Sequence, residues 1–199
     1  MKIITVAHQK GGVGKTTLAL NLGFCLKHSL RVAILDSDPQ GSISGLGEYA
    51  GIEGLDLIPL EDLGKVQDKY DVAIIDTPPY LTELLPEFFE LSDYVLVPTK
   101  AGVLDVMAIK ATIHLLKEAQ KRRPNLKAGI VMNMIQHNTS LTNDIKQLLE
   151  QYDMPIHQMM ITQRVSYARS PLTGGVFETD DEKAKEEIFG LTQEIISQL

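Results

Sequence analysis

Short runs of apolar, often β-branched residues alternate along the chain with longer stretches whose apolar positions recur at helical spacing. Several short runs, such as Val72-Ala73-Ile74-Ile75 and Tyr94-Val95-Leu96-Val97, contain no charged residue. Such runs are typical of strands buried on both faces, as in a parallel sheet covered by helices. The pattern predicts strands at Lys2–Ala7, Arg31–Leu35, Leu55–Pro59, Val72–Asp76, Tyr94–Pro98, Ala128–Asn133 and Pro155–Met159.

Seven longer segments have the spacing expected of amphipathic helices. Capping residues at Asn138-Thr139-Ser140 and acids at Asp180-Asp181-Glu182 mark two helix starts, and the stretch from Pro171 to Thr179 resembles a loop. Strands that alternate with helices predict an α/β, doubly wound, mainly parallel sheet flanked by helices, in one domain spanning residues 1–199. The predicted helices are Thr16–His28, Leu60–Lys69, Leu81–Glu90, Val103–Arg123, Ser140–Tyr152, Gln163–Arg169 and Asp181–Gln198.

Composition narrows the class of protein without naming it. Of 199 residues, 44% are hydrophobic and 23% charged, which is ordinary for a globular domain. The single cysteine, Cys25, excludes an intramolecular disulfide and favours a buried thiol in a reducing compartment. No apolar run approaches the length of a membrane span, so we expect a cytoplasmic protein. A net charge of −7 argues against a chain that is basic all over.

A glycine-rich loop joins the first predicted strand to the first predicted helix. It reads Lys10-Gly11-Gly12-Val13-Gly14-Lys15-Thr16-Thr17. Glycines let the backbone curl so that its N–H groups face phosphate oxygens, and the helix start adds a positive dipole end. Lys15 can reach the β- and γ-phosphates, the Thr16 hydroxyl can bind Mg²⁺, and Thr17 can bond near the α-phosphate. Gln9 stands where the strict phosphate-loop pattern has glycine.

This string resembles the deviant Walker A box of the ParA/MinD family of P-loop ATPases, and Gln9 suits the ParA branch. The resemblance implies an ATPase that binds ATP and ADP, needs Mg²⁺ to hydrolyse ATP to ADP and phosphate, and forms a homodimer on ATP. It also implies that Lys10 reaches the partner's nucleotide, as an arginine finger does in other NTPases. Taken outside the box, Lys10 would be a solvated loop lysine. We expect no helix-turn-helix before the loop, since the loop's strand starts at residue 2, as in the short ParA type.

Three aspartates follow predicted strands. Asp36 and Asp38 lie two residues apart after the second strand, and Asp76 closes a hydrophobic strand in the manner of a Walker B motif. On the residues alone, Asp36 to Pro39 could be a simple turn. The resemblance implies that Asp38 positions the attacking water, that Asp36 supports the Mg²⁺ shell with Asp76, and that Thr77-Pro78-Pro79 senses the γ-phosphate.

Two later residues are candidates for contact with the base. Asn133 ends a predicted strand, and its amide could pair with the adenine edge, although a turn or cap role stays open. Gln163 follows the last predicted strand and would form the other wall. Asp105 either caps the long helix or, as the resemblance implies, lies near the partner's nucleotide.

The resemblance also implies partners. ParA-like dimers bind DNA without sequence preference, which needs phosphate-directed Lys and Arg. We therefore expect non-specific DNA binding, nucleoid association when ATP is bound, and a ParB-like or small centromere-binding adaptor that stimulates hydrolysis. Membrane binding is not expected, because the tail from Ile188 has no Lys or Arg. The candidates for DNA contact are Lys117, Lys121, Arg122, Arg123, Lys127, Lys146, Arg164, Arg169, Lys183 and Lys185.

Partition of plasmid or chromosomal DNA is therefore the first functional hypothesis. The same ATPase could instead position a protein cargo, such as a chemoreceptor cluster or microcompartment. A metabolic P-loop enzyme is a third possibility, but one cysteine argues against a nitrogenase-reductase-like iron–sulfur protein. A pure binding module is a fourth, which the carboxylate of Asp38 opposes.

Overall fold

The computed structural model describes residues 1–37, 43, 54–79, 84–136 and 140–199. Its centre is a six-stranded sheet in the order β3-β2-β4-β1-β5-β6, and every pairing between these strands is parallel. The doubly wound α/β prediction is therefore confirmed. The strands are β1 Lys2–Val6, β2 Val32–Asp36, β3 Asp56–Leu57, β4 Val72–Asp76, β5 Tyr94–Thr99 and β6 Lys127–Met132.

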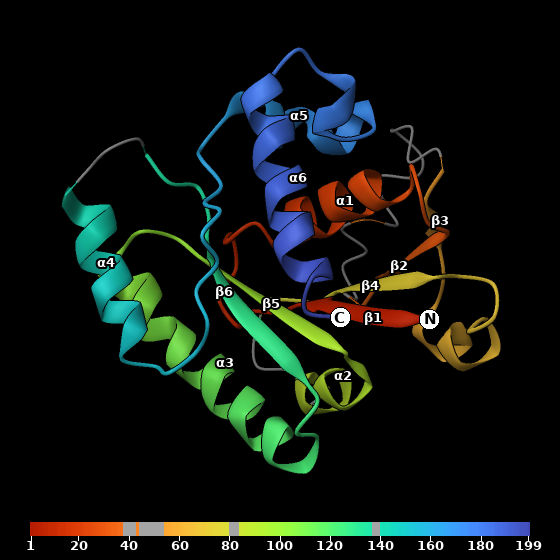
Figure 1. Ribbon diagram of the computed structural model, residues 1–199, viewed down its shortest axis with the longest axis horizontal. Coiled ribbons are helices and arrows are strands. Elements are labelled where there is room, and N and C mark those ends of the chain that lie inside the picture. Colours follow the sequence, from red (N-terminus) through yellow and green to blue (C-terminus); the bar gives the residue numbers. More distant parts are fainter. Residues whose placement is uncertain (38–42, 44–53, 80–83, 137–139) are drawn as a thin grey trace.

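Helices lie on both faces of this sheet (Figure 1). The α-helices are α1 Lys15–Leu26, α2 Leu85–Leu91, α3 Val103–Arg122, α4 Ser140–Glu150, α5 Val165–Thr173 and α6 Glu182–Ile196. Two short 3₁₀ helices join them, η2 Leu60–Lys65 and η3 Val176–Glu178. The carboxyl end of β1 leads directly into the glycine-rich loop and α1.

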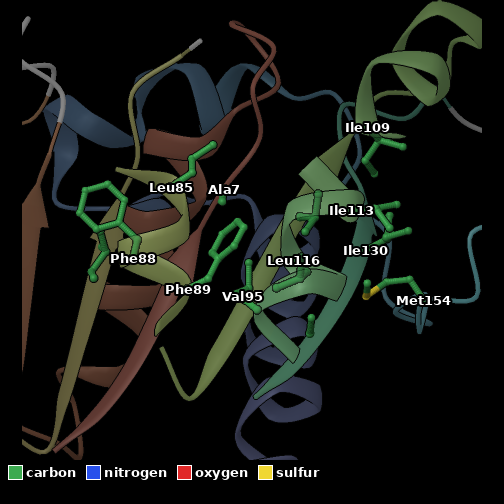
Figure 2. Packing of buried hydrophobic residues seen from close by; sticks show 14 of the residues in the cluster. Ala7, Leu85, Phe88, Phe89, Val95, Ile109, Ile113, Leu116, Ile130 and Met154 are labelled. Atoms are coloured by element: carbon green, nitrogen blue, oxygen red, sulfur yellow. The ribbon is translucent and has the colours of Figure 1, made fainter. Parts of the chain in front are cut away.

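Two hydrophobic cores sandwich the sheet, one on each face. Alternate strand residues point to opposite sides, so Ile3 and Ala7 join the core under α2 and α3, whereas Ile4 and Val6 join the core under α1 and α6. Figure 2 shows the first core, in which Phe88 and Phe89 of α2 are fully buried. Continuous apolar strands are thus explained by burial on both faces.

The predicted strand Pro155–Met159 is wrong. This segment makes a single bridge, Ile130 to Ile156, instead of a ladder. The N–H groups of Gln158 and Met159 donate to the carboxylate of Glu194 in α6, at 2.9 and 2.7 Å. Because a side chain takes these donors, the segment does not continue as a seventh strand.

The predicted loop from Pro171 to Thr179 is also wrong at its start. Helix α5 runs through Pro171 to Thr173, and it begins at Val165, two residues after Gln163. Proline removes a helical N–H, but the hydroxyl of Ser170 donates to the carbonyl of Tyr167 at 2.9 Å and supplies a substitute. The predicted helix Leu60–Lys69 is instead the short 3₁₀ helix η2, a segment that contains Gly64.

Candidate functional site

The glycine-rich loop curls between β1 and α1 because two of its glycines have left-handed backbones. Gly12 has φ 69° and Gly14 has φ 88°. A Cβ atom on Gly14 would lie 2.3 Å from Nδ2 of Asn133, whereas one on Gly12 would meet nothing within 4 Å. Both positions favour glycine for their conformation, and Gly14 also for lack of space.

The loop lies at the carboxyl edge of the sheet, where open parallel sheets bind ligands. Strand pairing sets Asp76 opposite Val6 on one side and opposite Asp36 on the other. The hydroxyl of Thr77 donates to the carbonyl of Val6 at 2.9 Å, which ties the end of β4 to the strand that leads into the loop. The residues predicted for phosphate and metal therefore meet at one edge.

Thr16 and Asp76 are in direct contact. The Thr16 hydroxyl donates to Oδ2 of Asp76 at 2.6 Å, and Asp76 is buried. Asp36 lies beside them, and its Oδ2 accepts the N–H of Ile43 at 2.9 Å. Asp38 lies outside the described residues. A hydroxyl beside carboxylates fits Mg²⁺, which takes oxygen ligands, keeps several waters and shares phosphate oxygens.

A cavity of about 310 Å³ opens over this loop. Lys15 is buried at its edge, and its ammonium lies 3.4 Å from the carbonyl oxygen of Lys10. Val13 is fully buried and anchors the loop. The cavity is lined by Gly12, Gly14, Lys15, Thr16, Thr17, Thr77, Pro79 and Met134.

Lys10 stands apart from this cavity. Its ammonium forms an ion pair with Oδ1 of Asp105 at 2.6 Å, with side chains 40% and 13% exposed. Its N–H donates to Nδ1 of His8 at 2.8 Å. The carboxylate of Asp105, near the start of α3, therefore holds Lys10 and is not simply a helix cap.

A second, largely apolar cavity of about 160 Å³ adjoins Thr17. Gln163 is exposed on its wall, whereas Asn133 is buried and its Nδ2 donates to the carbonyl of Val13 at 2.8 Å. The amide of Asn133 thus supports the loop, and contact of Asn133 and Gln163 with a base stays a prediction. The lining is Thr17, Leu18, Asn133, Met134, Ile161, Thr162, Gln163, Arg164, Tyr167 and Ala168.

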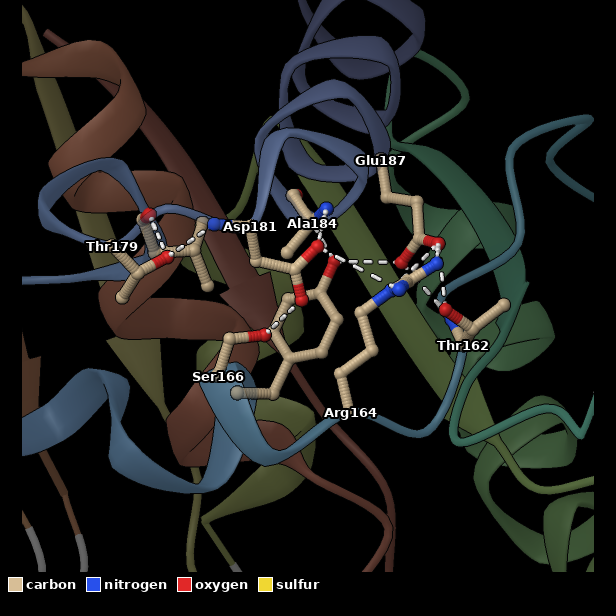
Figure 3. Close-up of polar contacts among 9 residues, drawn as sticks. Thr162, Arg164, Ser166, Thr179, Asp181, Ala184 and Glu187 are labelled. Atoms are coloured by element: carbon tan, nitrogen blue, oxygen red, sulfur yellow. Dashed lines mark hydrogen bonds and ion pairs between the residues drawn. The ribbon is translucent and has the colours of Figure 1, made fainter.

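Sequence reasoning missed two contributors here. Met134 has a left-handed backbone with φ 55° and lines both cavities. Glu187 of α6 accepts hydrogen bonds from the Thr162 hydroxyl at 2.6 Å and from Arg164 at 3.0 Å (Figure 3). The Tyr167 hydroxyl also donates to Glu187, at 2.8 Å, and burial beside this carboxylate raises the pKa of Tyr167. Nothing in the local sequence signals either role.

Many of the candidate DNA-contact residues already have acidic partners. Arg164 is mostly buried, forms an ion pair with Glu187 at 3.0 Å and lines the apolar cavity. The other ion pairs are Lys117 with Asp153, Lys121 with Glu118, Arg122 with Glu90 and Lys185 with Glu182. Exposed pairs of this kind are weak and can exchange for phosphate, so DNA binding stays a prediction.

Among the described helices, none is long and apolar enough to cross a bilayer.

Comparison with known proteins finds relatives that match this chain over most of their own length. The chain is 27% identical over 206 residues to maintenance of carboxysome distribution protein A of Halothiobacillus neapolitanus, covering 97% of this chain and 95% of the relative. It is 30% identical over 254 residues to the virulence plasmid ParA family protein pGP5-D of Chlamydia psittaci, covering 100% and 96%.

A solved structure shares the fold. An ATP complex of a McdA variant from Cyanothece matches with a TM-score of 0.81 at 17% identity, covering 99% of this chain and 96% of that one. The family model described as the CobQ/CobB/MinD/ParA nucleotide binding domain matches residues 4–177. The resemblance in the loop is therefore confirmed across the chain, which belongs to the CobQ/CobB/MinD/ParA family of nucleotide-binding domains.

Proposed function

We propose that this chain is a Mg²⁺-dependent ATPase of the ParA/MinD type that dimerises on ATP. The single observation that carries the proposal is the arrangement of two lysines on one loop. Lys15 borders the cavity over the glycine-rich loop, whereas Lys10 is not among the residues that line it and pairs with Asp105. One lysine suits the chain's own nucleotide, and the other is available to a second copy.

Within the chain, the curled backbone from Gly11 to Gly14 and the ammonium of Lys15 bind the triphosphate tail. Thr16 and Asp76, with Asp36 beside them, hold Mg²⁺, which neutralises charge on the phosphates. Asp38 orients the attacking water. Thr17 leads to the adjoining cavity, where Asn133 and Gln163 form walls for the base.

The face around Lys10 supports association of two copies. Val103, Leu104 and Met107 in the first turns of α3 have exposed fractions of 54%, 75% and 66%. They flank Asp105, which holds Lys10. Clustered exposed apolar residues beside a functional charge are typical of an interaction surface.

The test separates the two lysines. Lys15→Ala is expected to abolish ATP binding, because it removes the cation nearest the phosphates. Lys10→Ala is expected to keep nucleotide affinity in the monomer and to lose the dimer. Calorimetry with a non-hydrolysable analogue measures affinity, and sedimentation measures the dimer. Normal dimerisation of Lys10→Ala would refute the proposed switch.

For the biological role, we propose partition of plasmid or chromosomal DNA, with non-specific DNA binding on the nucleoid and a ParB-like or small centromere-binding adaptor that stimulates hydrolysis. Similarity to a plasmid ParA family protein over the whole chain supports this role. Steep loss of DNA affinity with added salt is the expected signature of phosphate contacts. Affinity that does not change with salt would contradict it.

A second role has its own support. The carboxysome distribution protein is similar over 97% of this chain, which favours positioning of a protein cargo by the same ATPase. The two roles differ in what stimulates hydrolysis at saturating DNA. Stimulation by a centromere-binding protein supports partition, and stimulation by a protein attached to a cargo assembly supports positioning.

A further inference from the structure

His8 lies between β1 and the glycine-rich loop and has no exposed surface. Its Nδ1 accepts the N–H of Lys10 at 2.8 Å. Its Nε2 is buried and has no hydrogen-bond partner in the described part of the chain. The imidazole therefore makes one directed contact, and that contact is to the main chain of Lys10.

Lys10 is held at three points. His8 accepts its N–H, the ammonium of Lys15 lies 3.4 Å from its carbonyl oxygen, and the carboxylate of Asp105 binds its ammonium at 2.6 Å. The proposed function requires two of these contacts to change. Lys15 turns to its own nucleotide, and the side chain of Lys10 leaves Asp105 for the nucleotide of the second copy. The contact with His8 can persist, because it depends on neither the Lys10 ammonium nor the Lys15 ammonium, the two groups that move.

We propose that His8 is a positioning residue for Lys10, fixing its main chain while its side chain moves from Asp105 to the nucleotide bound by a second copy of this chain. The inference rests on the proposed function, since it needs an ATP dimer in which Lys10 acts across the interface. By this inference His8, which lies outside the loop motif, governs how readily the dimer forms.

The electrostatic setting keeps His8 suited to this role. Burial lowers the pKa of His8 to about 4, and the nearby charges of Lys15 and Lys10 act in the same direction, against the carboxylate of Asp105. The imidazole is therefore neutral near pH 7. Because the N–H of Lys10 is a donor, the ring proton sits on Nε2 and leaves Nδ1 as the acceptor.

The test compares a variant that removes the acceptor with one that restores it. His8→Phe keeps a ring but leaves the Lys10 N–H without a partner. His8→Asn supplies a side-chain oxygen that can accept the N–H two residues later, as in an Asx turn. Nucleotide affinity of the monomer is expected to stay near wild type in both. In His8→Phe the backbone of Lys10 loses its restraint, so association must pay the entropy of ordering this one residue again. Dimerisation with a non-hydrolysable ATP analogue is therefore expected to weaken about 5- to 30-fold.

His8→Asn is expected to recover most of that loss, which a purely space-filling role for the ring would not allow. His28→Leu, at an exposed histidine after α1, is the control for loss of a histidine. Thermal unfolding checks each variant, and His8→Leu replaces His8→Phe if the latter does not fold. Wild-type dimerisation of the folded acceptor-free variant, or no recovery in folded His8→Asn, would overturn the inference. Wild-type dimerisation of Lys10→Ala would instead overturn the proposed function.

Discussion

Gly14→Ala is expected to destabilise the chain far more than Gly12→Ala, although the two glycines lie two residues apart in one loop. Both have left-handed backbones, with φ 88° and 69°. An alanine in that conformation costs about 1–2 kcal/mol, partly offset because the unfolded chain loses freedom. Gly12→Ala should therefore cost about 1 kcal/mol, since its new methyl group meets nothing within 4 Å.

Gly14→Ala carries a second penalty. Its methyl group would lie 2.3 Å from Nδ2 of Asn133, so this side chain must move. The move breaks the 2.8 Å hydrogen bond from Asn133 to the carbonyl of Val13. Loss of a buried hydrogen bond costs about 1–3 kcal/mol, which brings the expected total to about 3 kcal/mol.

Urea unfolding of the nucleotide-free chain measures both variants, and a double-mutant cycle separates the two penalties. In an Asn133→Ala background, most of the extra cost of Gly14→Ala should disappear, because Nδ2 is gone and the remaining close atom is the terminal methyl of the flexible Met134 side chain, at 3.3 Å. Equal penalties for the two single variants, or a Gly14→Ala penalty unchanged in that background, would refute the packing argument.

Two further outcomes follow from contacts in the site. Thr16→Ala should abolish the gain in ATP affinity that Mg²⁺ provides, whereas Thr16→Ser should keep it, because the hydroxyl that bonds Asp76 at 2.6 Å is the group that we propose binds Mg²⁺. Calorimetry with and without Mg²⁺ measures this gain, and an undiminished gain in Thr16→Ala would contradict the proposed role. The free energy of unfolding should fall as pH drops from about 6.5 to 4. Burial lowers the pKa of His8 to about 4 in the folded chain, whereas in the unfolded chain this histidine takes up a proton near pH 6.5, so in this range the unfolded state binds one more proton. The slope from this group is at most about 1.4 kcal/mol per pH unit. The slope of stability against pH should differ between wild type and His8→Asn in this range only, and identical slopes there would rule out His8 as the cause.

Features that depend on neighbouring residues could be predicted from the sequence. The strands of the sheet centre are apolar throughout, so their burial on both faces follows from composition alone. The loop from Lys10 to Thr17 places backbone amides, a lysine and a hydroxyl in order along the chain, so its chemistry is readable before any folding is known. The seventh predicted strand failed because a distant side chain, Glu194, takes the N–H donors of Gln158 and Met159.

The sequence by itself determined the apolar strands β1, β4 and β5 and the glycine-rich loop between β1 and α1, because each of these is written in contiguous residues. Only the tertiary structure decided that Lys10 rests on Asp105, 95 positions away, and that Asn133 bonds Val13, 120 positions away. Such partners are chosen by how strands and helices meet at the sheet edge, and chain order carries no record of that distance in space. His8 and Lys10 are only two positions apart, but the contact between them also depends on how the backbone turns after β1, which the residue types alone do not specify.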